Sequence, residues 1–386
     1  MRQVEPVYLD YAATAPVDPR VAAAMNECLT QTGVFGNPAS QHHYGRLARA
    51  RVEMARAQVA GLIGVAAPQV IWTSGATESN NLAILGTARA AAKLGKHIIT
   101  ARTEHKAVLD PCHRLEQEGF RVTYLTPDRD GLIDPAQVRE AIGLDTVLVS
   151  IMHVNNEIGV LQDIETIARH CRERGVPLHV DAAQSAGKIE IDLARSPVDL
   201  LSLTAHKLYG PKGIGALYVS PERRARLQPL MFGGGHERGL RSGTLAVHQI
   251  VGFGLACELC AGQHLEDARR IETLRTRLWE GLRGIEGALL NGHPTRRVTG
   301  ILNVSFPGVE GESLLLGLPE LALSTGSACN SDSDEPSYVL RALGRDTELA
   351  QSSLRFSLGR FSRGEDVDIA LAAVRREVGR LRAVAP

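Results

Sequence analysis

The chain has 386 residues, of which 44% are hydrophobic and 22% are charged, and its 43 lysines and arginines balance 43 aspartates and glutamates. This length predicts about two domains of ordinary globular composition. The balanced charge gives no electrostatic reason to expect nucleic acid or an anionic membrane as a main partner, and no stretch approaches the roughly 20 apolar residues of a membrane span.

The N-terminal sequence lacks the uninterrupted apolar core of a signal peptide, so we expect a cytoplasmic protein whose six cysteines are free thiols. Cys257 and Cys260 have the CxxC spacing of a metal or redox site. No second pair accompanies them, and the surrounding GLACELCAGQ has a helical pattern. This favours two core cysteines and no intrinsic metal site.

Between residues 70 and 220, short apolar runs alternate with helical segments, a pattern typical of a mostly parallel sheet covered by helices. The predicted strands are QVIWT (69–73), HIIT (97–100), VTYL (122–125), TVLVSIM (146–152), PLHV (177–180), DLLSL (199–203) and GALYV (215–219). IETIARHCRERG (164–175) predicts an amphipathic helix. After residue 260 a charged helix and shorter mixed segments follow. We therefore expect a large domain at 16–260 and a smaller α+β domain formed by 1–15 and 261–386.

Five of the predicted strands end in polar residues. The segments that follow them are SGATESNN, ARTEHKAV, HVNNEIG, DAAQSAGK and TAHKLYGPKG. The carboxyl ends of parallel strands lie at one edge of a sheet, where ligands bind. Polar residues far apart in the sequence are therefore expected to meet in one cleft.

The first of these segments suits an anion. Gly75, Ala76 and Thr77 lie between a strand and a helix start, where small residues let backbone N–H groups approach a phosphate. A capped helix start would explain the same residues.

Asp181 ends a buried strand, where a carboxylate is costly unless it meets a cation or donors. A protonated ring nitrogen or an arginine would meet that need.

Two strand-end residues allow several interpretations. His105 could stack on an aromatic ligand, move protons or simply pack, and Asn156, like Asn155, could be a turn residue. Lys207 is more informative, because a lysine at the end of a buried strand is expensive as a purely structural group. Desolvation lowers the pKa of an amine and makes it a nucleophile able to form a Schiff base. An anion site, an acid, a ring and an amine together are what pyridoxal 5′-phosphate (PLP) requires.

Cys329 differs from the other cysteines because it lies among Ser, Gly, Ala and Asn in LALSTGSACNSDSDEP. This composition predicts an accessible loop, where a thiol is either tolerated or used for its reactivity. Downstream, Arg355 in SLRFSLGRF is expected on a short strand. Its guanidinium could hold a carboxylate in a bidentate fork or form a surface salt bridge.

Together these segments resemble the cysteine desulfurases of the NifS/IscS group, most closely the IscS type, in the class-V aminotransferase family. The resemblance is carried by YLDYAATAPVDPRV, GNPAS, TSGATESNN, TEHKAVLD, SIMHVNNEIGV, HVDAAQSAGK, HKLYGPKGIGALYV, GGGHERGLRSGT, TGSAC…EPSYVLRALG and SSLRFSLGRF, in order and at the family's spacing. It implies an α/β PLP-dependent transferase of fold type I, similar to aspartate aminotransferase. It also implies a homodimer with active sites at the subunit interface.

The resemblance implies a role for each matching residue. Lys207 would form the Schiff base with PLP, Asp181 would pair with the pyridinium nitrogen, and His105 would stack on the ring and assist proton transfer. The other implied cofactor contacts are Asn156, Ala205, Gln184 at the phenolic oxygen, Ala76, Thr77, Thr204 and His206 around the phosphate, and Thr244, which reaches the phosphate from the other subunit. Asn156 and Arg355 would bind the substrate, and Cys329 would carry a persulfide.

The implied reaction converts L-cysteine to L-alanine. The substrate amine displaces Lys207, which then moves a proton from the α-carbon, and the Cys329 thiolate attacks the substrate sulfur. The persulfide passes to an acceptor, expected to be an iron–sulfur scaffold with which Cys329 would transiently share a cluster. Thiolation of tRNA is a further expected destination of the sulfur.

The chain departs from the family pattern in three places. Thr204-Ala205-His206-Lys207 stands where Ser-Gly-His-Lys is usual, and because the hydroxyl is kept we expect cofactor binding to persist. The loop CNSDSDEP is more acidic than the usual CTSxSxEP. Its Asp332 and Asp334 would oppose thiolate formation if they face the thiol, or act on the acceptor if they face outward. The chain ends short of the C-terminal extension with which long IscS proteins engage the scaffold, which leaves the acceptor open.

The sequence leaves three alternative functions open. One is a desulfurase dedicated to nitrogenase maturation or DNA sulfur modification. Another is a PLP-dependent aminotransferase or β-lyase that does not use Cys329. The third is a non-catalytic protein of the same fold, against which the joint retention of the lysine, histidine, aspartate, arginine and loop cysteine argues.

Overall fold

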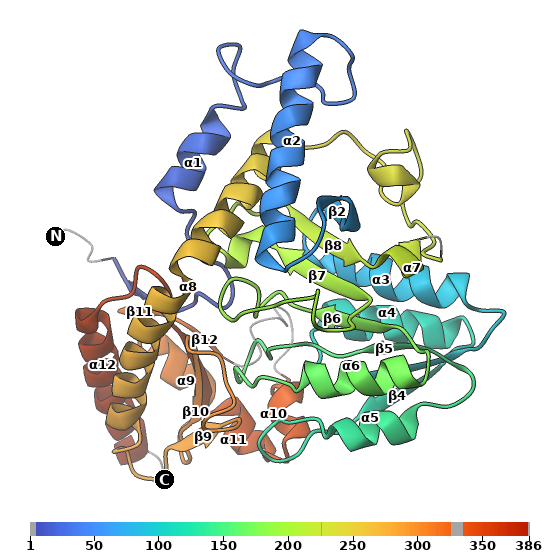
Figure 1. Ribbon diagram of the computed structural model, residues 1–386. Helices are drawn as coiled ribbons and strands as arrows, with labels where there is room; N and C mark the ends of the chain where they lie inside the picture. Colours follow the sequence, from blue (N-terminus) through green and yellow to red (C-terminus); the bar gives the residue numbers. More distant parts are fainter. Residues whose placement is uncertain (1–4, 225, 326–334, 385–386) are drawn as a thin grey trace.

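A computed structural model describes residues 5–224, 226–325 and 335–384. Its centre is a seven-stranded sheet, drawn mainly in green and blue in Figure 1, with the strand order β2-β8-β7-β6-β5-β3-β4. The strands are β2 (Val70–Thr73), β3 (His97–Ala101), β4 (Arg121–Leu125), β5 (Thr146–Ser150), β6 (Leu178–Asp181), β7 (Leu200–Thr204) and β8 (Gly215–Val219). All seven predicted strands are confirmed within a few residues of their predicted ends.

The sheet is mostly parallel. Strands β4, β3, β5, β6 and β7 pair in parallel, whereas β8 runs antiparallel to both β7 and β2. Because β8 is antiparallel to both of its neighbours, β2 runs in the same direction as these five strands, and the six strands end at one edge. The five predicted polar segments follow β2, β3, β5, β6 and β7 and therefore meet at this edge.

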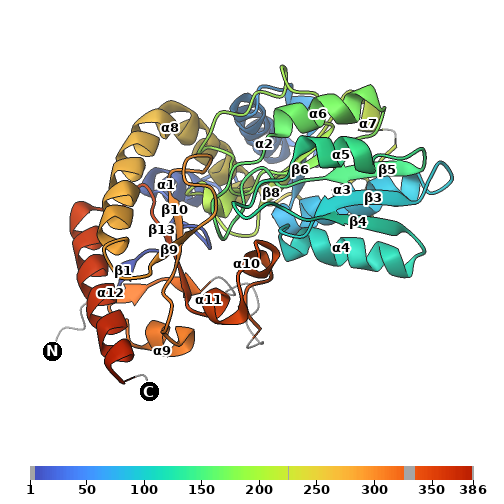
Figure 2. The same ribbon diagram turned by 90° about the horizontal axis from the view of Figure 1, so that it is seen from below.

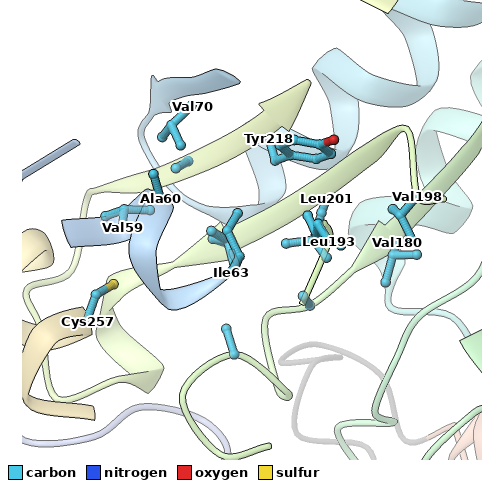
Figure 3. Close-up of a cluster of buried hydrophobic side chains, with 14 of the residues drawn as sticks. Val59, Ala60, Ile63, Val70, Val180, Leu193, Val198, Leu201, Tyr218 and Cys257 are labelled. Carbon is cyan, nitrogen blue, oxygen red and sulfur yellow. The ribbon is translucent and has the colours of Figure 1, made fainter. Parts of the chain in front are cut away.

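Successive strand residues face two different hydrophobic cores, because side chains alternate across a sheet. In β2, Trp72 faces one core and Ile71 the other. The first core includes helices α2 (His43–Leu62), α5 (Pro135–Ala141), α6 (Ile164–Glu173) and the start of α8 (Val247–Leu282). The second includes α3 (Ala76–Ala90) and α4 (Lys106–Gln117). Figure 3 shows part of the first core, which includes Val59 of α2, Ile63 directly after that helix, and Leu201 and Tyr218 of the sheet.

A second, smaller sheet has the order β12-β13-β10-β9. Its strands are β9 (Leu289–Asn291), β10 (Ile301–Ser305), β12 (Ser324–Thr325) and β13 (Ser353–Ser357). The C-terminal half of α8 and helix α12 (Gly364–Val384) lie side by side over it (Figures 1 and 2). Near the N-terminus, β1 (Val7–Tyr8) pairs with β11 (Leu321–Ala322). The N-terminal segment is thereby joined to the later part of the chain.

Helix α8 passes directly through the predicted domain boundary at residue 260. Cys257 and Cys260 belong to the core of the large sheet, whereas Ile271 and Leu278 belong to the core of the small sheet. The division into 16–260 and 1–15 plus 261–386 stays a prediction. Both cysteines are buried in this helix, which confirms their interpretation as core residues.

The remaining elements are short or lie at the periphery. They are α1 (Pro19–Asn26), α7 (Pro221–Arg224), α9 (Gly311–Leu316), α10 (Tyr338–Ala342), α11 (Thr347–Gln351) and the 3-10 turns η1 (Ala67–Gln69), η2 (Ala205–Lys207) and η3 (Glu237–Gly239). In the described ranges, no helix combines the length and the apolar character needed to cross a membrane.

Candidate active site

A cavity of about 520 Å³ opens at the carboxyl edge of the parallel strands. Ten of the predicted site residues line it, although they come from distant parts of the chain: Ala76, Thr77, His105, Asn156, Asp181, Gln184, Thr204, His206, Lys207 and Arg355. The convergence expected from the strand ends is therefore present in the fold.

Three predicted site residues are not among these. The Ala205 side chain is buried in the core of the large sheet, and its backbone N–H donates to the carbonyl of Ile214 at 3.1 Å. Thr244 is exposed and does not line this chain's cavity; its predicted role belongs to a second subunit. Cys329 lies outside the described residues, as do Asp332 and Asp334.

One wall of the cavity is the start of α3. Gly75 precedes this helix with φ +153°, a conformation that favours glycine, and the first N–H groups of a helix have no intrahelical acceptor. Thr204, at the end of β7, lies beside it: a Cβ on Gly75 would come within 3.8 Å of the Thr204 hydroxyl. This wall offers small residues, backbone donors and hydroxyls, the groups that hold a phosphate.

His206 follows Thr204 on the same side. Its Nδ1 lies 3.2 Å from the hydroxyl oxygen of Thr14. Burial and the nearby Lys207 and Lys212 lower the pKa of His206 to about 4. The imidazole is therefore neutral near pH 7 and can serve as a hydrogen-bond donor without adding a charge. Lys212 is exposed.

Asp181 occupies the end of β6 and is almost fully buried. Its Oδ2 accepts from Nδ2 of Asn80 at 2.7 Å, and its Oδ1 accepts from the backbone N–H of Ala183 at 2.9 Å. No arginine is paired with this carboxylate in the described part of the chain. Neutral donors fix its position, so its charge remains available to a cationic group in the cavity.

His105 caps helix α4. Its Nδ1 accepts from the backbone N–H of Ala107 at 3.0 Å, so a neutral ring carries its proton on Nε2. Burial and the nearby Lys207 lower the pKa of His105. The cap fixes the ring orientation, which suits a ring that stacks on a flat ligand.

Lys207 lies at the end of the turn η2, directly after β7. Its charge lowers the pKa of His105, His206 and Lys188, which places its amine amid groups that resist further positive charge. The Lys207 amine therefore lies close to the His105 and His206 rings and to the Lys188 amine.

Arg355 lies in β13 and is only 2% exposed, so it is not the surface salt bridge that the sequence left open. Its Nη1 donates to the Asn156 carbonyl at 3.0 Å, and its Nη2 donates to Oδ1 of Asp10 at 2.8 Å. Its Nε and the Oδ1 of Asn156 are buried and have no hydrogen-bond partner among the described residues. Two unsatisfied polar atoms in one cavity fit a polar ligand.

The structure adds three residues that sequence reasoning missed: Asn80, Asp10 and Lys188. Asn80 positions Asp181 and lies four residues into α3, within the quoted TSGATESNN. Asp10 lies in YLDYAATAP and pairs with Arg355 across 345 positions of sequence. Lys188 ends the quoted DAAQSAGK, and its amine donates to Oε1 of Gln184 at 2.8 Å. All three residues lie in motifs that the sequence analysis names, but which partner each one contacts depends on the fold.

The arrangement fits PLP. Asp181 can pair with a protonated pyridine nitrogen, the α3 wall can hold a phosphate, and Lys207 can react with an aldehyde. The unsatisfied atoms of Asn156 and Arg355 remain for the ring and a substrate carboxylate. No group of three or more His, Cys, Asp or Glu side chains in the described ranges could hold a metal ion.

Comparison with known proteins gives the same assignment. Residues 7–370 match the family model for the class-V aminotransferases. The cysteine desulfurase IscS of Pectobacterium carotovorum is 58% identical over 382 residues, covering 99% of this chain and 95% of that protein.

Two solved structures agree. One described as a NifS-like protein superposes with a TM-score of 0.90 at 36% identity, covering 98% of this chain and all of the other. A second, described as SspA in complex with cysteine, has a TM-score of 0.81 at 39% identity and covers 92% and 99% of the two chains. The chain therefore belongs to the class-V aminotransferase family and, within it, to the IscS-type cysteine desulfurases.

Proposed function

We propose that this chain converts L-cysteine to L-alanine in the cavity, with PLP bound covalently to Lys207, and leaves the sulfur on Cys329 as a persulfide. The observation that carries the proposal is the meeting of Lys207, His105, Asp181 and Arg355 in one cavity. The proposed destination of the sulfur is iron–sulfur cluster assembly, because the chain is of the type named cysteine desulfurase IscS.

Asp181, His105 and the α3 wall would hold the cofactor. PLP, when bound, supplies an electron sink that stabilises negative charge at the substrate α-carbon. Asp181, whose carboxylate is held in place by Asn80 and Ala183, would pair with the protonated pyridine nitrogen. His105 would cover the ring face, and Thr77, Thr204 and neutral His206 would bind the phosphate.

Arg355 would bind the substrate carboxylate through Nε, which has no other described partner, and through a terminal nitrogen. Asn156 is held next to it by the bond from Arg355 to its carbonyl. Lys207, once displaced by the substrate amine, is placed to take the proton from the α-carbon.

Sulfur transfer would use the Cys329 thiolate. The thiolate attacks the substrate sulfur, an S–S bond forms, and the C–S bond breaks with its electron pair passing to carbon. That carbon takes up a proton and leaves as alanine, so no outside oxidant or reductant is required.

The decisive experiment compares the wild-type protein with C329S and K207A. Wild type should be yellow, change colour on addition of L-cysteine, and form alanine. C329S should remain yellow yet lose alanine formation and persulfide, whereas K207A should lose the covalent cofactor. Full sulfur release by yellow C329S would refute the role of Cys329 and favour a lyase.

We further propose a homodimer, which would let Thr244 reach the partner's phosphate site. Large apolar side chains are exposed around α1 and α2 and in the segment before η3: Leu29, Phe35, Tyr44, Leu47, Met54, Met231 and Phe232. A set of this kind is typical of an interface. Sedimentation should give twice the chain mass, and F232D should shift it toward the monomer; a wild-type monomer with full activity would contradict the proposal.

The acceptor and the compartment complete the proposal. We place the enzyme in the cytoplasm, because the five cysteines in the described ranges are free and buried. The acceptor would be an iron–sulfur scaffold. Transfer of labelled sulfur from Cys329 to a purified scaffold protein tests this, and transfer only to a tRNA-thiolation partner would reassign the destination.

A further inference from the structure

Gln184 is fixed by two hydrogen bonds from opposite ends of its amide. Its Nε2 donates to the Ala12 carbonyl at 2.8 Å, and its Oε1 accepts from Nζ of Lys188 at 2.8 Å. A carbonyl can only accept, so the NH₂ group must face Ala12. The lysine amine carries N–H groups in both protonation states and favours the same orientation.

This arrangement determines what Gln184 can offer the cavity that it lines. One N–H of the NH₂ group is used by Ala12, and the carbonyl oxygen is used by Lys188. The group left for a ligand is the second N–H, a donor. Without Lys188, only the bond to the Ala12 carbonyl would hold the amide, so the second N–H would be less firmly directed at a ligand.

Lys188 is placed by a turn that has little room to move. Gly187 has φ +67°, and a Cβ there would lie 2.4 Å from Leu208 and 3.0 Å from Cys260. Lys188 thus sits between Gln184 and the segment that follows Lys207, and both lysines line one small cavity of about 40 Å³. The fold holds two amines near each other there.

A purely structural explanation for Lys188 is weak. No carboxylate forms an ion pair with it in the described part of the chain, and the charged groups that face it are Lys207, Arg355 and the weakly acidic Cys260 thiol. Burial and repulsion by Lys207 lower the pKa of Lys188 to about 7. An apolar residue would avoid this cost, so the amine must supply something that a methylene chain cannot.

We propose that Lys188 is a positioning residue that locks the Gln184 amide as a hydrogen-bond donor to a negatively charged ring oxygen of the ligand in the cavity. The inference rests on the proposed function, in which that oxygen is the phenolic oxygen of PLP. A donor stabilises the charge on this oxygen, so the proton shared between the oxygen and the Lys207 nitrogen leaves at lower pH. Without the hydrogen bond from Lys188 to Gln184, this shared proton should leave at a higher pH.

The test is a double-mutant cycle read by the absorbance of the bound cofactor during a pH titration. K188M and Q184L are measured singly and together. K188M should raise the titration midpoint by about half a unit to one unit, the equivalent of one ordinary hydrogen bond. Because the lock acts through Gln184, this shift should be much smaller in the Q184L background.

K212M is the matched control, because it removes a positive charge from the same cavity without touching the Gln184 amide. Its effect should be equal in both backgrounds. An equal K188M shift in both backgrounds, or no K188M shift, would overturn the inference and leave only a charge effect or none.

Two further readouts separate the possible failures. If K188M is unstable, K188R keeps N–H donors and should titrate like wild type; a raised midpoint in a folded K188R would overturn the inference. A wild-type protein that takes up no PLP would refute the proposed function itself, whereas a yellow wild type with an additive cycle refutes only the role of Lys188.

Discussion

Two buried arginines in this protein have very different surroundings. Arg56 donates from Nη1 and Nη2 to Glu237 at 2.7 and 2.9 Å, from Nη1 to the Val70 carbonyl, and from Nε to Glu53. It also lies over the Trp72 ring at 5.2 Å. All three guanidinium nitrogens therefore have acceptors.

Arg355 is equally buried but has unused donors. One N–H of Nη1 and one of Nη2 are bonded to Asn156 and Asp10, and Nε has no partner in the described structure. The contrast teaches that burial of an ion pair does not by itself indicate function. A saturated pair such as Arg56–Glu237 joins segments, whereas an unsaturated one that lines a cavity is prepared for a ligand.

The largest effect on catalysis is expected at Arg355. R355A removes the proposed carboxylate clamp and leaves Asp10 unpaired, so kcat/KM for L-cysteine should fall about 30-fold to about 5,000-fold, the equivalent of about 2–5 kcal/mol. Steady-state alanine formation measures this. Because the cofactor contacts remain, the protein should stay yellow; unchanged kcat/KM would show that Arg355 is only structural.

The Arg56–Glu237 pair, whose donors all have acceptors, should affect the stability of the protein rather than its activity. E237A leaves the Arg56 guanidinium buried without its carboxylate, so the free energy of unfolding should fall by about 3–5 kcal/mol. Denaturant unfolding measures this. The matched control is the double variant R56M/E237L, which removes both charges and should lose less stability than E237A. A double variant that loses more would contradict the interpretation.

Buried histidines predict a loss of stability in acid. Burial lowers the pKa of His179 to about 4, against about 6.5 in an unfolded chain, so the unfolded state binds more protons between these values. This contribution of about 3 kcal/mol is complete above pH 6.5 and is lost as the pH falls toward 4.

Unfolding free energies of wild type and H179Q at pH 7 and pH 5 check this sign. His179 lies between the hydroxyls of Ser150 and Ser202, which an uncharged amide can also contact. H179Q should therefore show a flatter pH dependence than wild type. An identical slope in the two proteins would rule out His179 as the source.

The smallest effect is expected at Asp10, which orients Arg355 and accepts from the Ser324 hydroxyl at 2.8 Å. D10N keeps the shape but removes the charge of the pair. We expect a loss of about 1.5 kcal/mol, or roughly tenfold in kcat/KM, because a charge-assisted bond is replaced by a neutral one. The loss should be absent in an R355A background; an additive loss would mean that Asp10 acts elsewhere.

The large sheet was predictable because each strand is a short apolar run followed by polar residues. The strands of the small sheet were not, apart from the segment around Arg355. β9 and β12 have only three and two residues, and their pairing is set by long-range contacts. A change of composition predicts a boundary at residue 260, yet α8 continues across this position, and its two halves pack on different cores.

The same difference, between strand ends and long-range packing, explains which residues of the site could be predicted. Lys207, Asp181 and His105 could be found because strand ends in a parallel sheet converge by geometry. Asp10 and Lys188 could not be assigned, because their partners Arg355 and Gln184 are set by packing rather than by a strand end. Sequence patterns thus located the cavity, and the structure supplied the residues that orient its side chains.

The central claim is that the cavity directs the sulfur of L-cysteine to Cys329. Intact-mass analysis of the PLP-loaded protein after one turnover with L-cysteine tests it most directly. The account predicts that wild type gains the mass of one sulfur atom, that C329S gains none, and that R355A gains it far more slowly. Equal sulfur gain in C329S and wild type would contradict the account.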